Sequence, residues 1–307
     1  MDWYEDIKSN LWVLPRGIQR DGMAGKNSMT WTSKYGSLVT AGFDVASADG
    51  INEKHLAAHL LYLAESDYGK RDEKIPGLAV HLWLQYFLDN FESVNQAVNF
   101  VKNNPFQVIP AMVPGTVEKP FSVHLMIEDS GGDSAIFEYV NGEVKIYHDS
   151  KYLVMTNSPP FDKQLDNLKQ YTGFGGNKPL PGTTDAADRF VRGAYYQRNL
   201  PEPNNLRETI AGVISVARNM AAPFGTSDPA RPNIAPTIWR TVSDLTNGVY
   251  YFESTTNPNI IWVKLQNLNF GEGASAKKLD LVNSPDLIGE VSEQFQDAKA
   301  FEWPKPI

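Results

Sequence analysis

The chain has 307 residues, of which 42% are hydrophobic and 21% charged, and it contains no cysteine. Its length suits one large domain with a sizeable core, and without cysteine these residues cannot supply a disulfide, a thiolate metal site or a thiol nucleophile. The 28 basic residues are outnumbered by 36 acidic ones, so the formal net charge of -8 disfavours binding to a nucleic-acid backbone.

Neither a membrane span nor a targeting segment is recognisable. No apolar run approaches the ~18 residues that a membrane helix needs. Residues 1–10 have neither the basic nor the apolar region of a signal peptide, so these residues give no support for export.

The first hundred residues predict strands followed by helices. Aromatic and β-branched segments predict strands at Asn10–Pro15, Met29–Ser33, Leu38–Ala41 and Leu56–Leu63. Helical patterns follow at Leu78–Asn90 and Ser93–Asn103, and Pro105 ends the second.

The middle of the chain predicts an antiparallel meander. Alternating apolar and polar residues mark strands at Ser122–Glu128, Ser134–Val140 and Glu143–His148, with Asn141-Gly142 as a tight hairpin turn. A short strand at Tyr152–Thr156 and a helix at Phe161–Tyr171 are expected next. The stretch Gly173–Gly176 follows that helix and opens none, so it predicts a loop and not a phosphate cradle.

The last part of the chain returns from helices to strands. Helices are predicted at Asp185–Gln197 and Leu206–Met220, a loop at Pro223–Pro236, and strands at Thr237–Asp244, Val249–Ser254 and Ile260–Leu265. This order predicts an α+β fold in which two helical layers cover antiparallel sheets. With no repeat or linker in view, we expect one domain over residues 1–307.

Isolated motifs carry little chemistry. The sequence has no HExxH, GxSxG, Walker or GxGxxG pattern. His55 and His59 have the spacing of metal ligands on a helix, but their segment predicts a strand and no third ligand is evident. His81, His124 and His148 are isolated. Ser275–Lys278 matches the SxxK pattern of serine hydrolases without its partner motifs, so a charged surface loop is favoured over a catalytic pair.

Three polar residues in apolar or aromatic surroundings have simple structural interpretations when taken singly. Asp2 would be a frayed terminal residue, and Asn157 would begin a turn before Ser-Pro. Arg189 would form a helix-surface ion pair with Asp185 or Asp188.

Taken together, however, these residues belong to a longer series of motifs. The series comprises Met1–Trp3, Asn10–Val13, Trp31–Gly36, Ala48–Lys54, Met155–Pro159, Gly175–Gly176 with Leu180–Gly182, and Arg189–Arg192. In order and spacing it resembles the choloylglycine hydrolase family, and most closely the penicillin V acylases of the Gram-negative type. The resemblance extends from residue 1 to about residue 265.

The resemblance implies the fold and the reaction. The fold would be the αββα sandwich of N-terminal nucleophile hydrolases. Members of the choloylglycine hydrolase family cleave linear amides: penicillin V, bile acids conjugated to glycine or taurine, or N-acyl homoserine lactones. Their nucleophile is an N-terminal cysteine whose own α-amino group, with a reference pKa near 8, acts as the base. No metal or organic cofactor is implied, and a homotetramer is the family expectation.

By the same resemblance, five residues receive roles. Asp2 would hold the amine of the nucleophile, Asn157 would donate to the oxyanion, and Arg189 would complete the polar site. Trp3 and Tyr62 would line the acyl pocket, with Tyr62 also offering a backbone N–H to the oxyanion. These two aromatic residues favour an aryl or alkyl acyl group over a bile acid.

The departures concern the N-terminus, one turn and one connection. Family members begin with the cysteine and carry an arginine shortly before the Met-Asp-Trp motif, whereas this chain starts at Met1 of that motif. We therefore expect either a chain truncated before its first strand, with an upstream cysteine and a periplasmic signal, or a non-catalytic remnant that binds acyl amides. His55 stands where the family usually has glycine. The connection from Asn157 to Arg189 is shorter than in Gram-positive members.

Overall fold

Two mainly antiparallel sheets form the centre of the computed structural model, which describes residues 1–113, 120–171, 178–226, 228, 234–284 and 286–300. Among these residues, the larger sheet has nine strands in the order β11-β10-β9-β6-β5-β4-β1-β15-β17. They are β1 (Asn10–Leu14), β4 (Ser37–Gly42), β5 (Ala46–Asn52), β6 (Ala57–Tyr62), β9 (Val123–Glu128), β10 (Ser134–Val140), β11 (Glu143–His148), β15 (Lys277–Leu279) and β17 (Gln296–Asp297).

The smaller sheet has the order β12-β13-β14-β16 in the same described part of the chain. Its strands are β12 (Trp239–Asp244), β13 (Val249–Ser254), β14 (Ile260–Lys264) and β16 (Gly289–Glu290), the last of which pairs in parallel with β14. Four short strands form two further two-stranded sheets. In one, β2 (Gln19–Asp21) pairs with β3 (Thr30–Thr32), and in the other, β7 (Gly77–Ala79) pairs with β8 (Gln107–Ile109).

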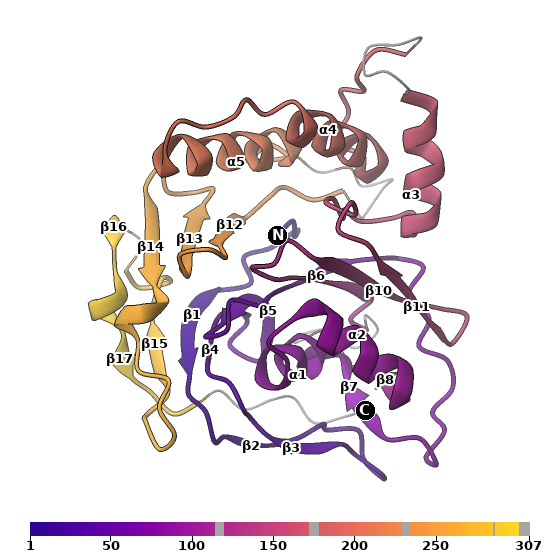
Figure 1. The fold of residues 1–307 in the computed structure, drawn as a ribbon, viewed down its shortest axis with the longest axis vertical. Coiled ribbons are helices and arrows are strands. Elements are labelled where there is room, and N and C mark those ends of the chain that lie inside the picture. The colour runs from indigo at the N-terminus through magenta and orange to yellow at the C-terminus, as the bar shows by residue number, and fades with distance from the viewer. Residues whose placement is uncertain (114–119, 172–177, 227, 229–233, 285, 301–307) are drawn as a thin grey trace.

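Helices cover the outer faces of both sheets (Figure 1). On one side α1 (Trp83–Asn90) packs on β5 and β6, next to α2 (Val94–Asn103); on the other α4 (Ala186–Arg198) lies beside α5 (Leu206–Met220), which contacts β12. The helix α3 (Phe161–Leu168) packs against α4. Short 3-10 helices lie at η1 (Val80–Leu82), η2 (Lys169–Tyr171), η3 (Leu265–Asn267) and η4 (Ser292–Gln294). The layers confirm the predicted αββα sandwich.

Apolar residues explain why these layers hold together. In α2 the predicted apolar face is the buried one, and the Ser93 side chain caps the helix by accepting from the Gln96 N–H. One cluster joins α1 and α2 to the large sheet and includes Trp83, Phe87 and Phe137. A second fills the space between the sheets and includes Leu38, Tyr250 and Val263. Burial of this apolar surface is the main force that stabilises the fold.

Local sequence patterns predicted most of these elements. The helix α5 and the strand β13 have the predicted bounds, and positive φ angles at Asn141 and Gly142 agree with the tight hairpin turn. The predicted strand at Tyr152–Thr156 is wrong, because that segment forms neither a strand nor a helix. Gly77–Ala79 forms β7, so the predicted first helix starts later. The predicted loop Gly173–Gly176 lies outside the described residues.

The turn before β6 explains why glycine suits position 55. His55 has a φ angle of 64°, in the left-handed region that glycine adopts without steric cost. The imidazole Nδ1 of His55 lies 2.8 Å from the carbonyl oxygen of Leu245, which ties this turn to the loop between β12 and β13. The histidine is therefore accommodated in a strained backbone conformation by a contact between the sheets.

Candidate active site

Arg189 connects two residues that are far away in the sequence. From α4, its Nη1 donates to the Asp2 carboxylate at 2.9 Å, and its Nη2 donates to the Asn157 side-chain oxygen at 2.8 Å. Its Nε donates to the carbonyl oxygen of Thr184 at 3.0 Å. The side chains of Arg189 and Asp2 are only 13% and 17% exposed. The surface ion pair with Asp185 or Asp188 is therefore the wrong interpretation, since the guanidinium group points inward.

Asp2 is held by backbone and side chain together. It forms a β-bridge with Thr237, just before β12, and the Thr237 hydroxyl donates to the second carboxylate oxygen at 2.5 Å. The backbone N–H of Trp3 bonds the carbonyl oxygen of Pro236, and the Met1 α-amino group donates to that of Trp239 at 2.9 Å. Asp2 is therefore not frayed. Burial lowers the pKa of the Met1 amine, although Asp2 opposes this effect.

Asn157 is fixed by contacts on both of its polar groups. Its amide nitrogen donates to the carbonyl oxygen of Tyr62 at 2.8 Å, and its side-chain oxygen accepts from Arg189. Its backbone carbonyl accepts from the Gln164 side chain at 3.2 Å. Because Arg189 occupies the side-chain oxygen, the predicted role of Asn157 as the start of a simple turn is wrong. The amide is oriented by tertiary contacts instead.

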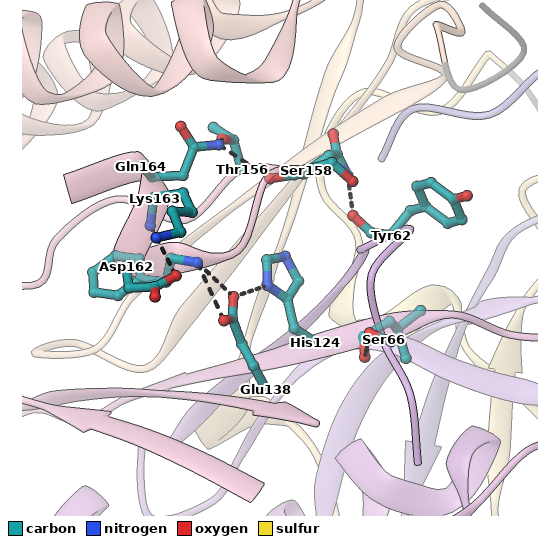
Figure 2. A network of polar contacts seen from close by, with 12 residues as sticks. Tyr62, Ser66, His124, Glu138, Thr156, Ser158, Asp162, Lys163 and Gln164 are labelled. Carbon is teal, nitrogen blue, oxygen red and sulfur yellow. Dashed lines mark hydrogen bonds and ion pairs between the residues drawn. The ribbon is translucent and has the colours of Figure 1, made fainter. Parts of the chain in front are cut away.

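A buried carboxylate supports the segment that carries Asn157, and sequence reasoning missed it. Figure 2 shows Glu138 of β10 between His124 of β9 and the start of α3. The fully buried Glu138 accepts from the Phe161 N–H at 3.0 Å and lies 2.9 Å from Nδ1 of His124. A negative charge is favourable at a helix N-terminus, where N–H groups lack partners. His124 is therefore not isolated, and its cross-strand neighbour could have been found from the meander pattern.

Two cavities meet at these residues. The polar one, of about 150 Å³, is lined by Asp2, Tyr62, Asn157 and Arg189, together with Met1, Thr237 and Arg240. The apolar one, of about 70 Å³, is lined by Trp3 and Tyr62 with Phe43, Leu60, Val80 and Phe121. The two cavities share Met1 and Tyr62, and each of the five predicted residues lines at least one of them; we call the two cavities together the cleft. Thr237 and Arg240 were not predicted, and neither stands in a recognisable motif.

The apolar cavity also contains a histidine that stays neutral. His81 lines it, and burial lowers the pKa of His81 to about 4. Burial also raises the pKa of Tyr62, whose phenol consequently stays protonated at neutral pH. The described side chains that line the apolar cavity therefore carry no charge at neutral pH, which suits an apolar group.

The remaining candidates occupy other parts of the fold. His59 pairs with Asp49 of β5, and His148 lies 2.7 Å from Asp133. Lys278 belongs to β15, not to a surface loop, and donates to Asp44 at 2.7 Å. Within the described residues, no group of three or more His, Asp or Glu side chains could hold a metal ion. No helix in that part of the chain is long and apolar enough to cross a membrane.

Known proteins are similar to this chain in sequence. A family model for linear amide C-N hydrolases, choloylglycine hydrolase family, matches residues 1–288. A penicillin V acylase of Pectobacterium atrosepticum is 44% identical, covering 99% of this chain and 86% of that protein. A bile salt hydrolase/transferase of Clostridium perfringens is 26% identical over 89% of each chain.

A solved structure agrees with these sequence relatives. The penicillin V acylase from Agrobacterium tumefaciens superimposes with a TM-score of 0.91 at 44% identity, covering 99% of this chain and 94% of that one. A mutant conjugated bile acid hydrolase from Clostridium perfringens gives a TM-score of 0.75 at 25% identity, over 91% of each chain. The chain therefore belongs to the choloylglycine hydrolase family, whose members hydrolyse the C–N bonds of linear amides.

Proposed function

We propose that this protein is an acylase that cleaves penicillin V or a similar amide with an aryl or alkyl acyl group. The observation that carries the proposal is the contact of Arg189 with both Asp2 and Asn157, beside an uncharged apolar cavity. One cleft thus offers a polar end for the amide and an apolar end for the acyl group, the usual division in small-molecule sites.

Trp3 and Tyr62 would bind the acyl group. Both line the apolar cavity, and their flat rings can stack on a phenoxy ring or cover an alkyl chain. The 70 Å³ cavity is small for a steroid, which supports the preference for penicillin V over a conjugated bile acid. N-acyl homoserine lactones, whose acyl chains are linear, are the second candidate class of substrate.

Asn157 would stabilise the tetrahedral intermediate. One N–H of its amide donates to Tyr62, and an asparagine amide carries a second that can donate to an oxyanion. Arg189 holds that amide in place and forms an ion pair with Asp2. Asp2 in turn can hold a protonated amine at the nucleophile. Tyr62 contributes its carbonyl to this arrangement, in addition to the backbone N–H expected from the family.

The nucleophile in this proposal is a cysteine thiol, activated by an α-amino group. The thiolate attacks the amide carbon, the C–N bond breaks, and the proton taken by the amine passes to the leaving amine. Water then releases the acyl group. The 307 residues contain no cysteine, so we propose that they contribute the donors and the acyl pocket, while the thiol lies outside them.

The test compares two proteins. One is the 307-residue chain, and the other is the protein purified from the cells that produce it, with its N-terminal residue read by mass spectrometry. We expect the first to bind penicillin V without cleaving it, and the second to begin with cysteine and to hydrolyse penicillin V. Hydrolysis by the cysteine-free chain would contradict the thiol mechanism. If the natural protein cleaved glycodeoxycholate, a conjugated bile acid, faster than penicillin V, the proposed substrate class would be wrong.

We also propose that residues 1–307 form one domain and that the protein assembles as a homotetramer. The first proposal is supported by apolar contacts that are continuous from α1 and α2 to the large sheet, and the second by the family resemblance. A single cooperative unfolding transition and the mass from light scattering test the two separately.

A further inference from the structure

A larger cavity lies on the other side of Trp3 from the acyl cleft. It has a volume of about 370 Å³ and sits at one end of the small sheet, between residues 3–6 and the loop that joins β13 to β14. Trp3 lines both this cavity and the apolar cavity of the cleft. Volumes of about 300–1,000 Å³ are typical of small-molecule sites.

The floor of this cavity is rigid and aromatic. Trp239 and Phe252 are 5% and 6% exposed, and the Trp239 indole N–H donates to the Ser9 hydroxyl at 2.8 Å. The rings of Trp3 and Tyr4 are stacked, with their centroids 5.3 Å apart. At the rim Phe224 is 77% exposed, an unusual position for a large apolar side chain. Aromatic faces thus surround the cavity on several sides.

The charges around this cavity have one sign. Glu5 and Asp6 line it, and none of the described residues that line it is lysine, arginine or histidine. Asp6 accepts from the Lys8 backbone N–H through one carboxylate oxygen. Aromatic faces attract cations through the negative charge of their π systems, and carboxylates add to that attraction.

This charge pattern separates the cavity from the site of the proposed reaction. The polar end of the acyl cleft contains two basic residues, Arg189 and Arg240, and one carboxylate, Asp2, so it is compatible with a substrate that carries a carboxylate, as penicillin V does. Glu5 and Asp6 would repel that carboxylate. A ligand of the larger cavity must therefore differ in charge from the substrate of the cleft.

We propose that this cavity is a second binding site, for an organic cation that consists of an ammonium group on an aromatic or branched aliphatic body. The apolar body packs on Trp239 and Phe252, and the ammonium group lies near Tyr4, Glu5 and Asp6. Because Trp3 borders both cavities, occupancy of this site changes the environment of the acyl cleft.

The test uses the 307-residue chain and three probes of similar size: benzyltrimethylammonium, phenylacetate and benzyl alcohol. Binding is followed by tryptophan fluorescence and by saturation-transfer NMR. We expect the cation to bind at least tenfold more tightly than the anion and the neutral alcohol, and to bind more weakly as salt concentration rises. Equal binding of cation and anion would overturn the proposal.

Matched variants locate the site. The double variant E5Q/D6N keeps both side-chain shapes and the acceptor for Lys8, and should weaken cation binding about tenfold. Thr256→Trp places a bulky ring in the cavity from an exposed position and should abolish binding. The control Glu143→Gln removes an exposed charge on β11 and should have no effect. Binding that survives Thr256→Trp would overturn the site. None of the three probes is an acyl amide, so these binding measurements do not depend on whether the protein hydrolyses amides.

Discussion

Asp49 and Asp2 both join distant parts of the chain, but Asp49 is enclosed by protein whereas Asp2 borders a cavity. Asp49 of β5 lies between the sheets, 6% exposed, with His59 Nδ1 2.5 Å away and the Tyr250 hydroxyl donating at 2.6 Å. Asp2 accepts from Arg189 and Thr237 and lines the polar cavity. The contacts of Asp49 therefore stabilise the packing of the sheets, whereas similar contacts hold Asp2 beside a cavity that has room for a ligand.

The ionisation of Asp49 shows how an enclosed charge is stabilised. Burial alone would raise the pKa of Asp49, but His59 and the hydrogen bond from Tyr250 lower it overall. Burial would lower the pKa of His59, but Asp49 and then Glu128 raise it to about 10. Both groups are thus charged at neutral pH. The pair connects β5 and β6 to β13 of the other sheet, so it stabilises the packing of the two sheets.

The largest effect is expected from Asp49→Asn, which removes the nearer of the two carboxylates that face His59. Breaking a buried ion pair on one side costs about 3–5 kcal/mol of unfolding free energy. Urea denaturation measures it, and the double variant D49N/H59Q should be more stable than the sum of the two single changes predicts. A decrease in unfolding free energy below about 1 kcal/mol would show that Asp49 contributes little to the packing of the two sheets.

A smaller loss of stability, with a loss of ligand binding, is expected from Arg189→Leu. The change leaves one carboxylate oxygen of Asp2 and the side-chain oxygen of Asn157 without the Arg189 donor, which costs about 2 kcal/mol. Penicillin V affinity, measured by calorimetry on the 307-residue chain, should fall at least tenfold. Arg189→Lys should restore part of the stability but not the affinity, since one ammonium cannot reproduce the forked contacts. Unchanged affinity in both variants would exclude Arg189 from the site.

The pH dependence of stability should separate the two kinds of buried group. The contribution of His59 to the free energy of unfolding is complete below pH 6.5, the pKa of histidine in the unfolded chain. This contribution is lost as the pH rises through about 10, the pKa of His59 in the folded protein. The Asp49 contribution is present above about 3.8 and is lost as pH falls through its lowered pKa. His81, with a pKa of about 4, adds a loss of stability as pH falls from 6.5 to 4.

Unfolding free energies of the chain and of D49N, measured from pH 3 to pH 10.5, check these signs. The variant should lose most of the decline above pH 6.5 but keep the acid-side loss of stability caused by His81. Glu128 faces His59 Nε2 at 3.7 Å, so Glu128→Gln should lessen the alkaline decline without removing it. An alkaline decline of equal size in D49N would contradict the assignment.

The smallest effect is expected from Ser275→Ala. Ser275 is exposed, and Lys278 of the same motif is bonded to Asp44. Stability should change by less than about 0.5 kcal/mol, and hydrolysis by the natural protein should be unchanged. Loss of hydrolysis would revive the serine and lysine as a catalytic pair.

Local sequence patterns identified elements whose own residues carry the signal. The apolar face of α2 and the alternating strands β9, β10 and β11 follow from periodicity, and Asn141-Gly142 specifies its turn. The strand β5 was missed, because Ala46–Asn52 is rich in alanine, serine, aspartate and glycine, which disfavour strands in isolation. It is a strand because β4 and β6 pair with it on both sides.

The sequence by itself, through its periodicity and its family motifs, determined the order of elements and the fold family, and it supplied the five residues that we propose for the site. Tertiary structure alone decided their partners. Arg189 lies 187 residues from Asp2, and His59 faces Asp49 only because β5 and β6 pair in that register. Such contacts depend on how the sheets and α4 pack, and no local pattern encodes which charged residue a buried side chain meets.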